Sequence, residues 1–213
     1  MKRPLIVGIA GGSGSGKTTL AHGLRDLMAD VDSVVISQDH YYWGLPEGVS
    51  PEAYNFDDPA ALDLEGLALD LAELKAGHSI KIPAYDFTSH RRAAAVQAVT
   101  PPSLIIVEGL FLFTHPALSA VFDLRFFVDV PSPERLRRRM LRDQRERGRN
   151  AAEIREQWDR QVEPMYVRHI LPARQNAEFV LNLPHPDDLV YCEQIAALWK
   201  TVEERLRANP RTA

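Results

Sequence analysis

The pattern with the clearest chemical meaning lies near the start of the chain, where residues 11–18 are Gly-Gly-Ser-Gly-Ser-Gly-Lys-Thr. This segment fits G-x-x-x-x-G-K-[ST] and falls between an apolar run and a segment of helical period. Its glycines let consecutive backbone N–H groups surround phosphate oxygens, and the following helix N-terminus adds partial positive charge. We therefore expect Lys17 to reach the β- and γ-phosphates of a nucleotide and Thr18 to offer its hydroxyl to Mg²⁺.

Two acids follow apolar runs further along the chain. Asp39 comes after the run 33–37, and Glu108 follows the run 104–107. Ligands of open parallel sheets bind outside the carboxyl ends of the strands, so both acids are expected to face the phosphate loop. One can enter a metal shell while the other takes a proton from an acceptor hydroxyl. The presence of both favours an enzyme over a nucleotide-binding regulator that transfers nothing.

Arginines are concentrated in one segment. Eight lie between residues 135 and 149, with only Asp143 and Glu146 as acids among them. Their three- and four-residue spacing makes more than one helix face basic. Because arginine binds phosphate oxygens in a bidentate manner, the segment is interpreted as a lid over the transferring phosphoryl group. A solvated face paired to nearby acids is the alternative for about half of these arginines.

Hydrophobic patterning predicts the elements that position these residues. The runs 5–10, 33–37, 104–107, 124–130 and 178–181 are continuously apolar, as in strands buried on both faces. Segments of helical period alternate with them, so we predict an α/β fold of the P-loop NTPase type, with a doubly wound parallel sheet of about five strands. One domain, 1–213, would carry an acceptor-binding insertion, 39–102, with a hairpin of 79–85 against 93–100. An arginine-rich helical lid would span 132–150.

Composition excludes several classes of protein. The chain has 213 residues, 45% of them hydrophobic, and a formal net charge of -4. This charge argues against nucleic-acid binding, and no apolar run approaches the ~18 residues that span a bilayer. The single cysteine, Cys192, falls on the apolar positions of the last helical segment and is predicted to be a buried thiol in a reducing compartment. A cytoplasmic protein is expected, ending in a frayed tail at 209–213.

Several blocks together resemble the uridine–cytidine kinase branch of the phosphoribulokinase/uridine kinase family. They occur in family order over roughly 180 residues. The blocks are the phosphate loop, 38–42 (Gln-Asp-His-Tyr-Tyr), 54–57 (Tyr-Asn-Phe-Asp), 82–90, 107–109, 142–149, Gln157 and 163–165. The resemblance implies ATP-dependent phosphorylation of the 5′-hydroxyl of uridine or cytidine, with ATP or GTP as donor and Mg²⁺ as cofactor. It also implies a homotetramer.

The resemblance assigns a role to each matching residue. Asp39 would accept the hydroxyl proton, with Lys17 and Arg142 as further catalytic residues, and Thr18, Asp39 and Glu108 would hold the metal. Asp57, Arg139 and Gln157 would bind the ribose hydroxyls, while Tyr85 and His90 would recognise the pyrimidine edge. The implied nucleotide-binding residues are Gly11, Gly12, Ser13, Gly14, Ser15, Gly16, Lys17, Thr18, Thr19, Arg142 and Arg147. The implied substrate-binding residues are Asp39, Tyr42, Phe56, Asp57, Tyr85, Phe87, His90, Arg139, Arg149 and Gln157.

Two departures from the family pattern bear on substrate binding, the first on the ribose-binding loop of the acceptor and the second on how the ATP base is seated. Asp58 replaces the usual histidine of Asp-His-Pro, and Leu183-Pro184-His185 replaces the usual Arg-Gly-Gly. A sister kinase acting on ribulose 5-phosphate, pantothenate or another nucleoside is therefore the nearest alternative, and a non-catalytic nucleotide-binding regulator is the alternative from another class.

Overall fold

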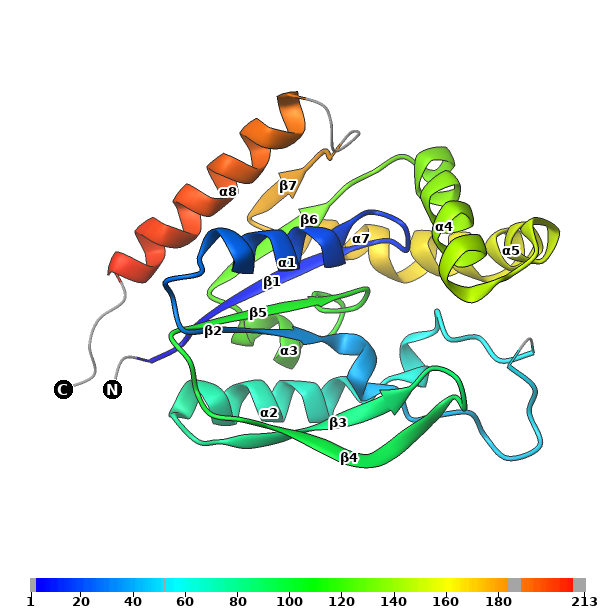
Figure 1. Cartoon of the computed structure of the whole chain (residues 1–213), viewed down its shortest axis with the longest axis horizontal. Helices are drawn as coiled ribbons and strands as arrows, with labels where there is room; N and C mark the ends of the chain where they lie inside the picture. Colours follow the sequence, from blue (N-terminus) through cyan, green and yellow to red (C-terminus); the bar gives the residue numbers. More distant parts are fainter. Residues whose placement is uncertain (1–2, 52, 184–188, 209–213) are drawn as a thin grey trace.

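The computed structural model describes residues 3–51, 53–183 and 189–208, and a parallel β-sheet forms the centre of the molecule (Figure 1). The strands are ordered β2-β5-β1-β6-β7, and every neighbouring pair is parallel. They are β1 (Leu5–Gly11), β2 (Ser33–Ser37), β5 (Leu104–Gly109), β6 (Leu124–Val128) and β7 (Phe179–Leu181). The prediction of a five-stranded parallel sheet is confirmed, with strand ends that differ by one or two residues.

Helices cover both faces of the sheet and explain why its strands are continuously apolar. On one face, α1 (Lys17–Leu27) and α8 (Leu189–Ala208) pack on alternate residues of the central strands, such as Val7 and Ile9. On the other face, α2 (Leu64–Ala76) and α3 (Pro116–Val121) pack on the intervening residues, such as Ile6. Since successive side chains of a strand point to opposite faces, both sets are buried.

The predicted hairpin forms in the insertion between β2 and β5. Its strands are β3 (Ile80–Asp86) and β4 (Arg91–Val99), which pair antiparallel with a register shift between Pro83 and Ala84. The insertion also contains the short helices η1 (Gln38–Tyr41) and η2 (Pro59–Ala61).

Arg92 joins the hairpin to the loop before η2. Its guanidinium donates to the backbone oxygens of Tyr41 and Tyr42, pairs with Asp63 at 3.2 Å and lies 4.4 Å from the ring centroid of Trp43. The hairpin is therefore fixed against the segment that carries Asp39.

The predicted lid is mainly α4 (Ser132–Arg147), which ends at Gly148 in the left-handed conformation with φ 61°. A further helical segment returns to the sheet. Its parts are α5 (Ala151–Gln157), η3 (Trp158–Val162), α6 (Glu163–Met165), η4 (Tyr166–Ile170), α7 (Leu171–Ala173) and η5 (Arg174–Asn176). Pro164 and Pro172 lack the backbone N–H of a regular helix, and η3 and η4 are π-helical.

The prediction that Cys192 is buried is wrong, because its side chain is exposed. The inner face of α8 is formed by Ile195, Leu198 and Val202, with Cys192 beside that face. The predicted positions Ile195 and Val202 do pack in the core, whereas Tyr191 and Leu198 take the places expected for their neighbours Cys192 and Trp199. The predicted tail at 209–213 lies outside the described residues.

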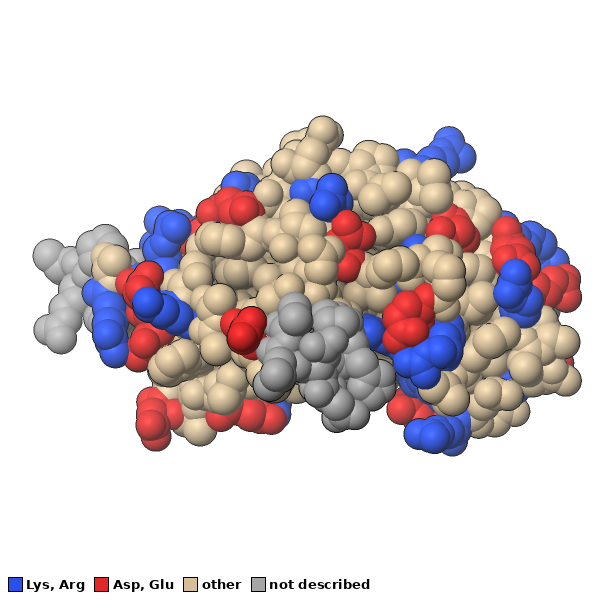
Figure 2. Space-filling view, turned by 90° about the horizontal axis from the view of Figure 1, so that it is seen from above, with Lys and Arg blue, Asp and Glu red and all other residues tan. Residues whose placement is uncertain are grey.

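The surface and the helices agree with the composition. Acidic and basic side chains are intermixed on the face that Figure 2 shows, without a continuous field of one sign among the described residues. None of the helices in the described part of the chain is both long and apolar enough to cross a bilayer.

Replacing Arg92 with alanine is expected to lower the free energy of unfolding by about 1–3 kcal/mol, because two backbone hydrogen bonds, an ion pair and a cation–π contact are lost together. Urea denaturation measures the change. The matched control is Arg91→Ala, since Arg91 is the exposed neighbour of Arg92 on β4. Equal stability of the two variants would contradict the anchoring role of Arg92.

Candidate active site

The phosphate loop connects β1 to α1 and depends on glycine at two positions. Gly14 has φ 76°, and a Cβ there would lie 2.2 Å from the backbone oxygen of Arg135. Gly16 has φ 94° and immediately precedes α1. Only glycine adopts such angles at low cost, and only glycine allows this approach to α4. The loop is therefore shaped by its own backbone and by contact with the lid.

Glu108 lies at the end of β5 and connects three elements. Its Oε1 accepts a hydrogen bond from Ser37 Oγ at 2.5 Å, and its Oε2 accepts one from Thr18 Oγ1 at 3.0 Å. Lys17 Nζ lies 3.9 Å from the same Oε2. Lys17, Thr18 and Glu108 are thus brought together as expected.

Asp39 lies in η1, directly after β2, and its side chain is half-buried. Burial and, to a lesser extent, the negative charge of Glu108 together raise the pKa of this carboxyl to about 6. Lys17 and Arg147 act in the opposite direction, while Asp57 adds to the increase in the pKa. A carboxylate with this pKa is ionised at neutral pH and is a stronger base than an ordinary aspartate.

The oxygen groups at this edge fit a magnesium ion. Thr18 supplies a hydroxyl, and Glu108 supplies the carboxylate that accepts a hydrogen bond from this hydroxyl. Asp39 is close enough to Glu108 for their charges to interact. Mg²⁺ in nucleotide sites is held by one or two carboxylates plus phosphate oxygens, so no larger ligand cluster is required. Among the described residues there is no group of three or more His, Cys, Asp and Glu side chains that could hold a metal by itself.

Arg139 extends from α4 to the phosphate loop. Its Nη1 donates to Ser13 Oγ at 2.9 Å, and its Nη2 donates to Gln157 Oε1 at 2.9 Å. Arg149 donates to the same Gln157 oxygen at 2.8 Å. Burial lowers the pKa of the Arg139 guanidinium, and the charge of Asp57 opposes that change. Arg139 therefore links the phosphate loop to the other two predicted ribose-binding residues, Gln157 through a hydrogen bond and Asp57 through its charge.

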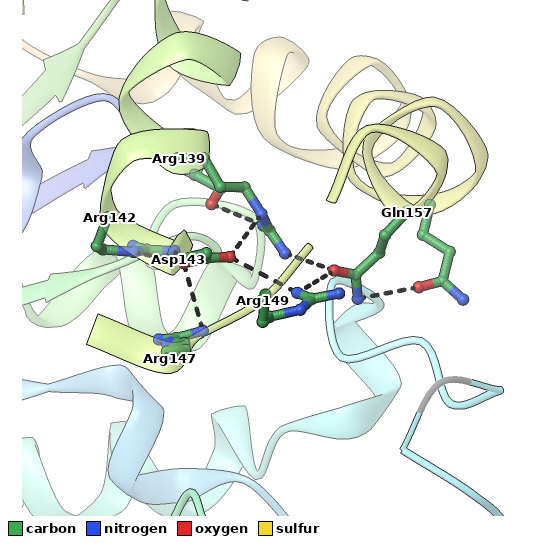
Figure 3. Close-up of polar contacts among 8 residues, drawn as sticks. Arg139, Arg142, Asp143, Arg147, Arg149 and Gln157 are labelled. Carbon is green, nitrogen blue, oxygen red and sulfur yellow. Dashed lines mark hydrogen bonds and ion pairs between the residues drawn. The ribbon is translucent and has the colours of Figure 1, made fainter. Parts of the chain in front are cut away.

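Arg142 and Arg147, predicted to serve the phosphates, lie near the end of α4 and converge on Asp143 with Arg139 and Arg149 (Figure 3). The charge of Arg147 lowers the pKa of Asp39, which places this arginine close to the acids of the site. Arg142 donates to Asp143 at 2.8 Å and has a partly exposed side chain.

The predicted nucleoside-binding aromatics form a continuous group through ring contacts. Tyr42 contacts Phe56 and Tyr85, with ring centroids 5.7 and 5.2 Å away. Phe56 stacks on His90 at 4.9 Å, and Tyr85 contacts the exposed Phe87 at 5.1 Å. His90 has φ 53°, an uncommon angle for a non-glycine residue.

The hydroxyls of two of these rings interact electrostatically with the acids, while the Tyr42 hydroxyl donates to the Phe56 backbone oxygen at 3.0 Å. Burial raises the pKa of Tyr85 to about 12, and the charges of Tyr54 and Asp39 contribute. The pKa of Tyr42 is also raised by burial, by Asp39 and by Asp57. The buried Tyr85 hydroxyl has no hydrogen-bond partner among the described residues, so it is available to a polar ligand.

One of the two sequence departures is explained locally. The Asp58 carboxylate accepts a hydrogen bond from the Ala60 backbone N–H at 2.9 Å and caps η2. It is therefore engaged within its own turn. The other departure is Leu183-Pro184-His185. The backbone oxygen of Leu183 accepts a hydrogen bond from Arg138, and Pro184 and His185 lie outside the described residues. Thr19 is exposed on α1 beside the phosphate loop.

Sequence reasoning missed three residues that shape the site. Ser37 holds Glu108, and Asp143 gathers the lid arginines. Arg135 is buried behind the loop, between the rings of Tyr166 and Trp158, at 3.7 and 5.1 Å. The available signal was position: Ser37 ends a strand, and Asp143 is one of only two acids in the arginine run.

Comparisons with known proteins agree with this geometry. The model of the phosphoribulokinase/uridine kinase family matches residues 6–189. The uridine kinase of Halalkalibacterium halodurans is 38% identical over 182 residues, which are 84% of this chain and 86% of that protein. Uridine kinase-like proteins 5 and 3 of Arabidopsis thaliana are 33% and 35% identical, and the match spans 39% of the length of each. A crystal structure from Silicibacter sp. TM1040 has TM-score 0.70 at 24% identity, covering 84% of this chain and 90% of that one.

The raised pKa of Asp39 predicts a pH-dependent stability. Folding favours the protonated carboxyl, so its stabilisation is complete below the unfolded value of 3.8 and is lost as the pH rises through about 6. In EDTA at pH 7.5, Asp39→Asn is expected to be more stable than the wild type by about 1–3 kcal/mol, and the difference should disappear below about pH 4. Urea denaturation across this range tests it.

The exposed Asp26, which pairs with Arg25 on α1, supplies the control variant Asp26→Asn. This variant is expected to show no such pH-linked gain. A constant difference between wild type and Asp39→Asn at all pH values would contradict the burial of a charged Asp39.

Proposed function

The chain belongs to the phosphoribulokinase/uridine kinase family, and from this premise we propose that it transfers a phosphoryl group from ATP to the 5′-hydroxyl of uridine and cytidine, giving UMP and CMP. It is a nucleoside kinase. One observation supports this most directly: the Asp39 carboxyl is close enough to interact electrostatically both with Lys17 and Glu108 of the phosphate site and with Tyr42 and Tyr85 of the aromatic group. A general base between a donor site and a ring-lined acceptor site is what nucleoside phosphorylation requires.

Asp39 acts as the base. Its carboxylate accepts the proton of the 5′-hydroxyl as the hydroxyl oxygen attacks the terminal phosphorus of the donor, while the bond from that phosphorus to the bridging oxygen breaks and the nucleoside diphosphate leaves. The pKa of about 6 suits this role, because the group is ionised at neutral pH and still holds a proton well. Asp39 therefore increases the nucleophilicity of the acceptor oxygen at the point where transfer occurs.

Cationic groups stabilise the phosphoryl group during transfer. Lys17 begins α1, where backbone N–H groups add to its positive charge. Arg142 and Arg147 extend from the lid, and Arg147 is near Asp39. Thr18, Asp39 and Glu108 would hold Mg²⁺, which supplies neutralisation of phosphate charge when bound. Positioning and electrostatic stabilisation account for most of the catalysis in this chemistry.

The acceptor is held by two groups of side chains. Asp57, Arg139 and Gln157 bind the ribose 2′- and 3′-hydroxyls through their carboxylate, guanidinium and amide. The Tyr85 hydroxyl and the His90 ring meet the polar edge of the pyrimidine, and Arg149 supports Gln157. Tyr42, Phe56 and Phe87 pack around the nucleoside, and aromatic walls at this spacing favour a single-ring base.

The remaining features of the proposal follow the family. Residues 39–102 form the acceptor-binding insertion and residues 132–150 form the lid of a single kinase domain, 1–213. The enzyme acts in the cytoplasm as a homotetramer, with ATP or GTP as the phosphoryl donor. Its partner is a small molecule rather than a nucleic acid or a membrane, in accord with the net charge of -4 and the mixed surface charge.

An acceptor panel tests the substrate assignment. The kcat/KM values for uridine and cytidine are expected to exceed those for deoxyuridine by roughly 10²–10⁴, because a site built to bond a hydroxyl leaves buried polar groups unpaired when it is missing. Adenosine, ribulose 5-phosphate and pantothenate should be poorer still. Coupled ADP detection with each compound measures this, and pyrimidine ribonucleosides ranking at or below the others would overturn the assignment.

Replacing Asp39 with asparagine tests the base. Turnover of uridine is expected to fall by roughly 10²–10⁴, while ATP affinity changes little, because the amide keeps the shape but cannot accept the proton. Wild-type kcat/KM should rise with pH through about 6 as Asp39 ionises. Steady-state kinetics and calorimetric ATP titration with and without Mg²⁺ provide the measurements. Loss of ATP affinity in step with turnover would instead make Asp39 chiefly a metal ligand.

A further inference from the structure

One buried carboxylate organises four lid arginines, and we call this group the arginine cluster: Asp143 with Arg139, Arg142, Arg147 and Arg149 (Figure 3). The Asp143 Oδ1 accepts from Arg142 at 2.8 Å and lies 3.8 Å from Arg147 Nη1. Its Oδ2 lies 3.5 Å from Arg139 Nε and 3.6 Å from Arg149 Nη1. The four guanidinium groups therefore converge on one side chain.

The cluster carries more positive than negative charge. The side chain of Asp143 is fully buried, and its single negative charge meets four positive ones, which leaves a surplus of three. Like charges a few ångströms apart repel by several kcal/mol at the effective dielectric of such sites. Without Asp143 the four groups would separate, so the carboxylate is what makes their convergence possible.

The backbone of Asp143 also ends helix α4 at this position. Its carbonyl oxygen accepts from the N–H of Arg149 at 3.1 Å and caps α4 through Gly148, which has φ 61°. This reversal of the chain returns Arg147 and Arg149 toward Arg139. The side chain and the backbone of one residue thus fix both the direction and the contacts of the lid arginines.

The arginine cluster also contacts the phosphate loop, and some of its polar atoms have no hydrogen-bond partner among the described residues. Arg139 donates to Ser13 Oγ in that loop. Yet the buried Arg139 Nε and Asp143 Oδ2 have no hydrogen-bond partner among the described residues, because their separation is that of an ion pair only. Arg142 and Arg147 are 37% and 49% exposed, so their remaining N–H groups can meet a ligand. A tetrahedral oxyanion is the ligand that matches several converging arginines.

We propose that Asp143 is the positioning residue of the lid: its carboxylate holds the four arginines converged beside the phosphate loop, so that Arg142 and Arg147 offer positive charge to the phosphoryl group in transfer while Arg139 and Arg149 stay aligned on Ser13 and Gln157. The proposal rests on the proposed kinase function. Asp143 itself does not touch substrate. It acts through Arg139, Arg142, Arg147 and Arg149, and it keeps their charge low enough for the cluster to form before the anion binds.

The test compares Asp143→Asn with Asp159→Asn. Asp159 is a matched control because it also pairs with an arginine four residues away, Arg155 at 2.9 Å, but both side chains are exposed. With uridine as acceptor, kcat of Asp143→Asn is expected to fall by roughly 10–100-fold per folded molecule, because the arginines lose their alignment. The control should keep wild-type kcat.

Inorganic sulfate distinguishes positioning from a general loss of structure. In Asp143→Asn the surplus charge rises by one and the freed guanidinium groups lack an oxyanion partner. Competitive inhibition by sulfate against ATP is therefore expected to strengthen by roughly 10-fold relative to wild type and control. Wild-type turnover in Asp143→Asn would overturn the proposal, and so would lost turnover with sulfate inhibition at the wild-type level.

If Asp143→Asn folds poorly, the effect of sulfate on its melting temperature still tests the proposal. Sulfate should replace the missing carboxylate and raise the melting temperature of Asp143→Asn by more than it raises that of the wild type. Equal shifts would overturn the proposal. If wild-type enzyme fails to phosphorylate pyrimidine ribonucleosides, the proposed acceptor is wrong, whereas the sulfate and melting comparisons still decide the role of Asp143.

Discussion

The carboxylate of Glu108 is the group on which the geometry of the site depends. It lies at the end of β5, between β2 and β1, and its two oxygens accept from Ser37 on one neighbour and Thr18 after the other. A buried charge is costly unless it is bonded in this way. The same charge raises the pKa of Asp39, so the arrangement that fixes the phosphate loop also makes the proposed base more basic.

Charge is divided between two structural units in a way that suits transfer of an anion. Asp39 and Glu108 lie on the sheet edge, while the lid carries Arg139, Arg142 and Arg147. The sheet edge therefore has an excess of negative charge, and the lid has an excess of positive charge. A phosphate chain with its metal ion can neutralise both excesses at once, which gives the lid a physical reason to lie over the loop. Asp143 keeps the arginines together in the absence of that ligand.

The acceptor side depends on contacts between segments that are distant in sequence. Tyr42 follows η1, Phe56 lies in the loop before η2, and Tyr85 comes from β3, yet their rings touch. Arg92 holds these segments together through the backbone oxygens after Asp39. The proposed base, Asp39, and the aromatic group are therefore held together by the same contacts. This coupling explains why an inserted hairpin, outside the main sheet, contributes to a site at its edge.

The sequence by itself determined the sheet, the phosphate loop and the identity of the acids at the strand ends. These features are local: continuous apolar runs, glycine spacing and an acid after a strand each specify a short segment. The roles of Asp57, Tyr85 and His90 came from family resemblance and remain predictions. Only the tertiary structure decided which side chains meet. Periodicity placed Cys192 among the buried residues of α8, but the structure packs its neighbour Tyr191 against the core instead, because contact with the sheet decides which of two adjacent residues is covered. Likewise, the spacing along the chain puts four arginines within six residues of Asp143, but only the structure shows that all four guanidinium groups turn onto its two oxygens, where the chain reverses at Gly148.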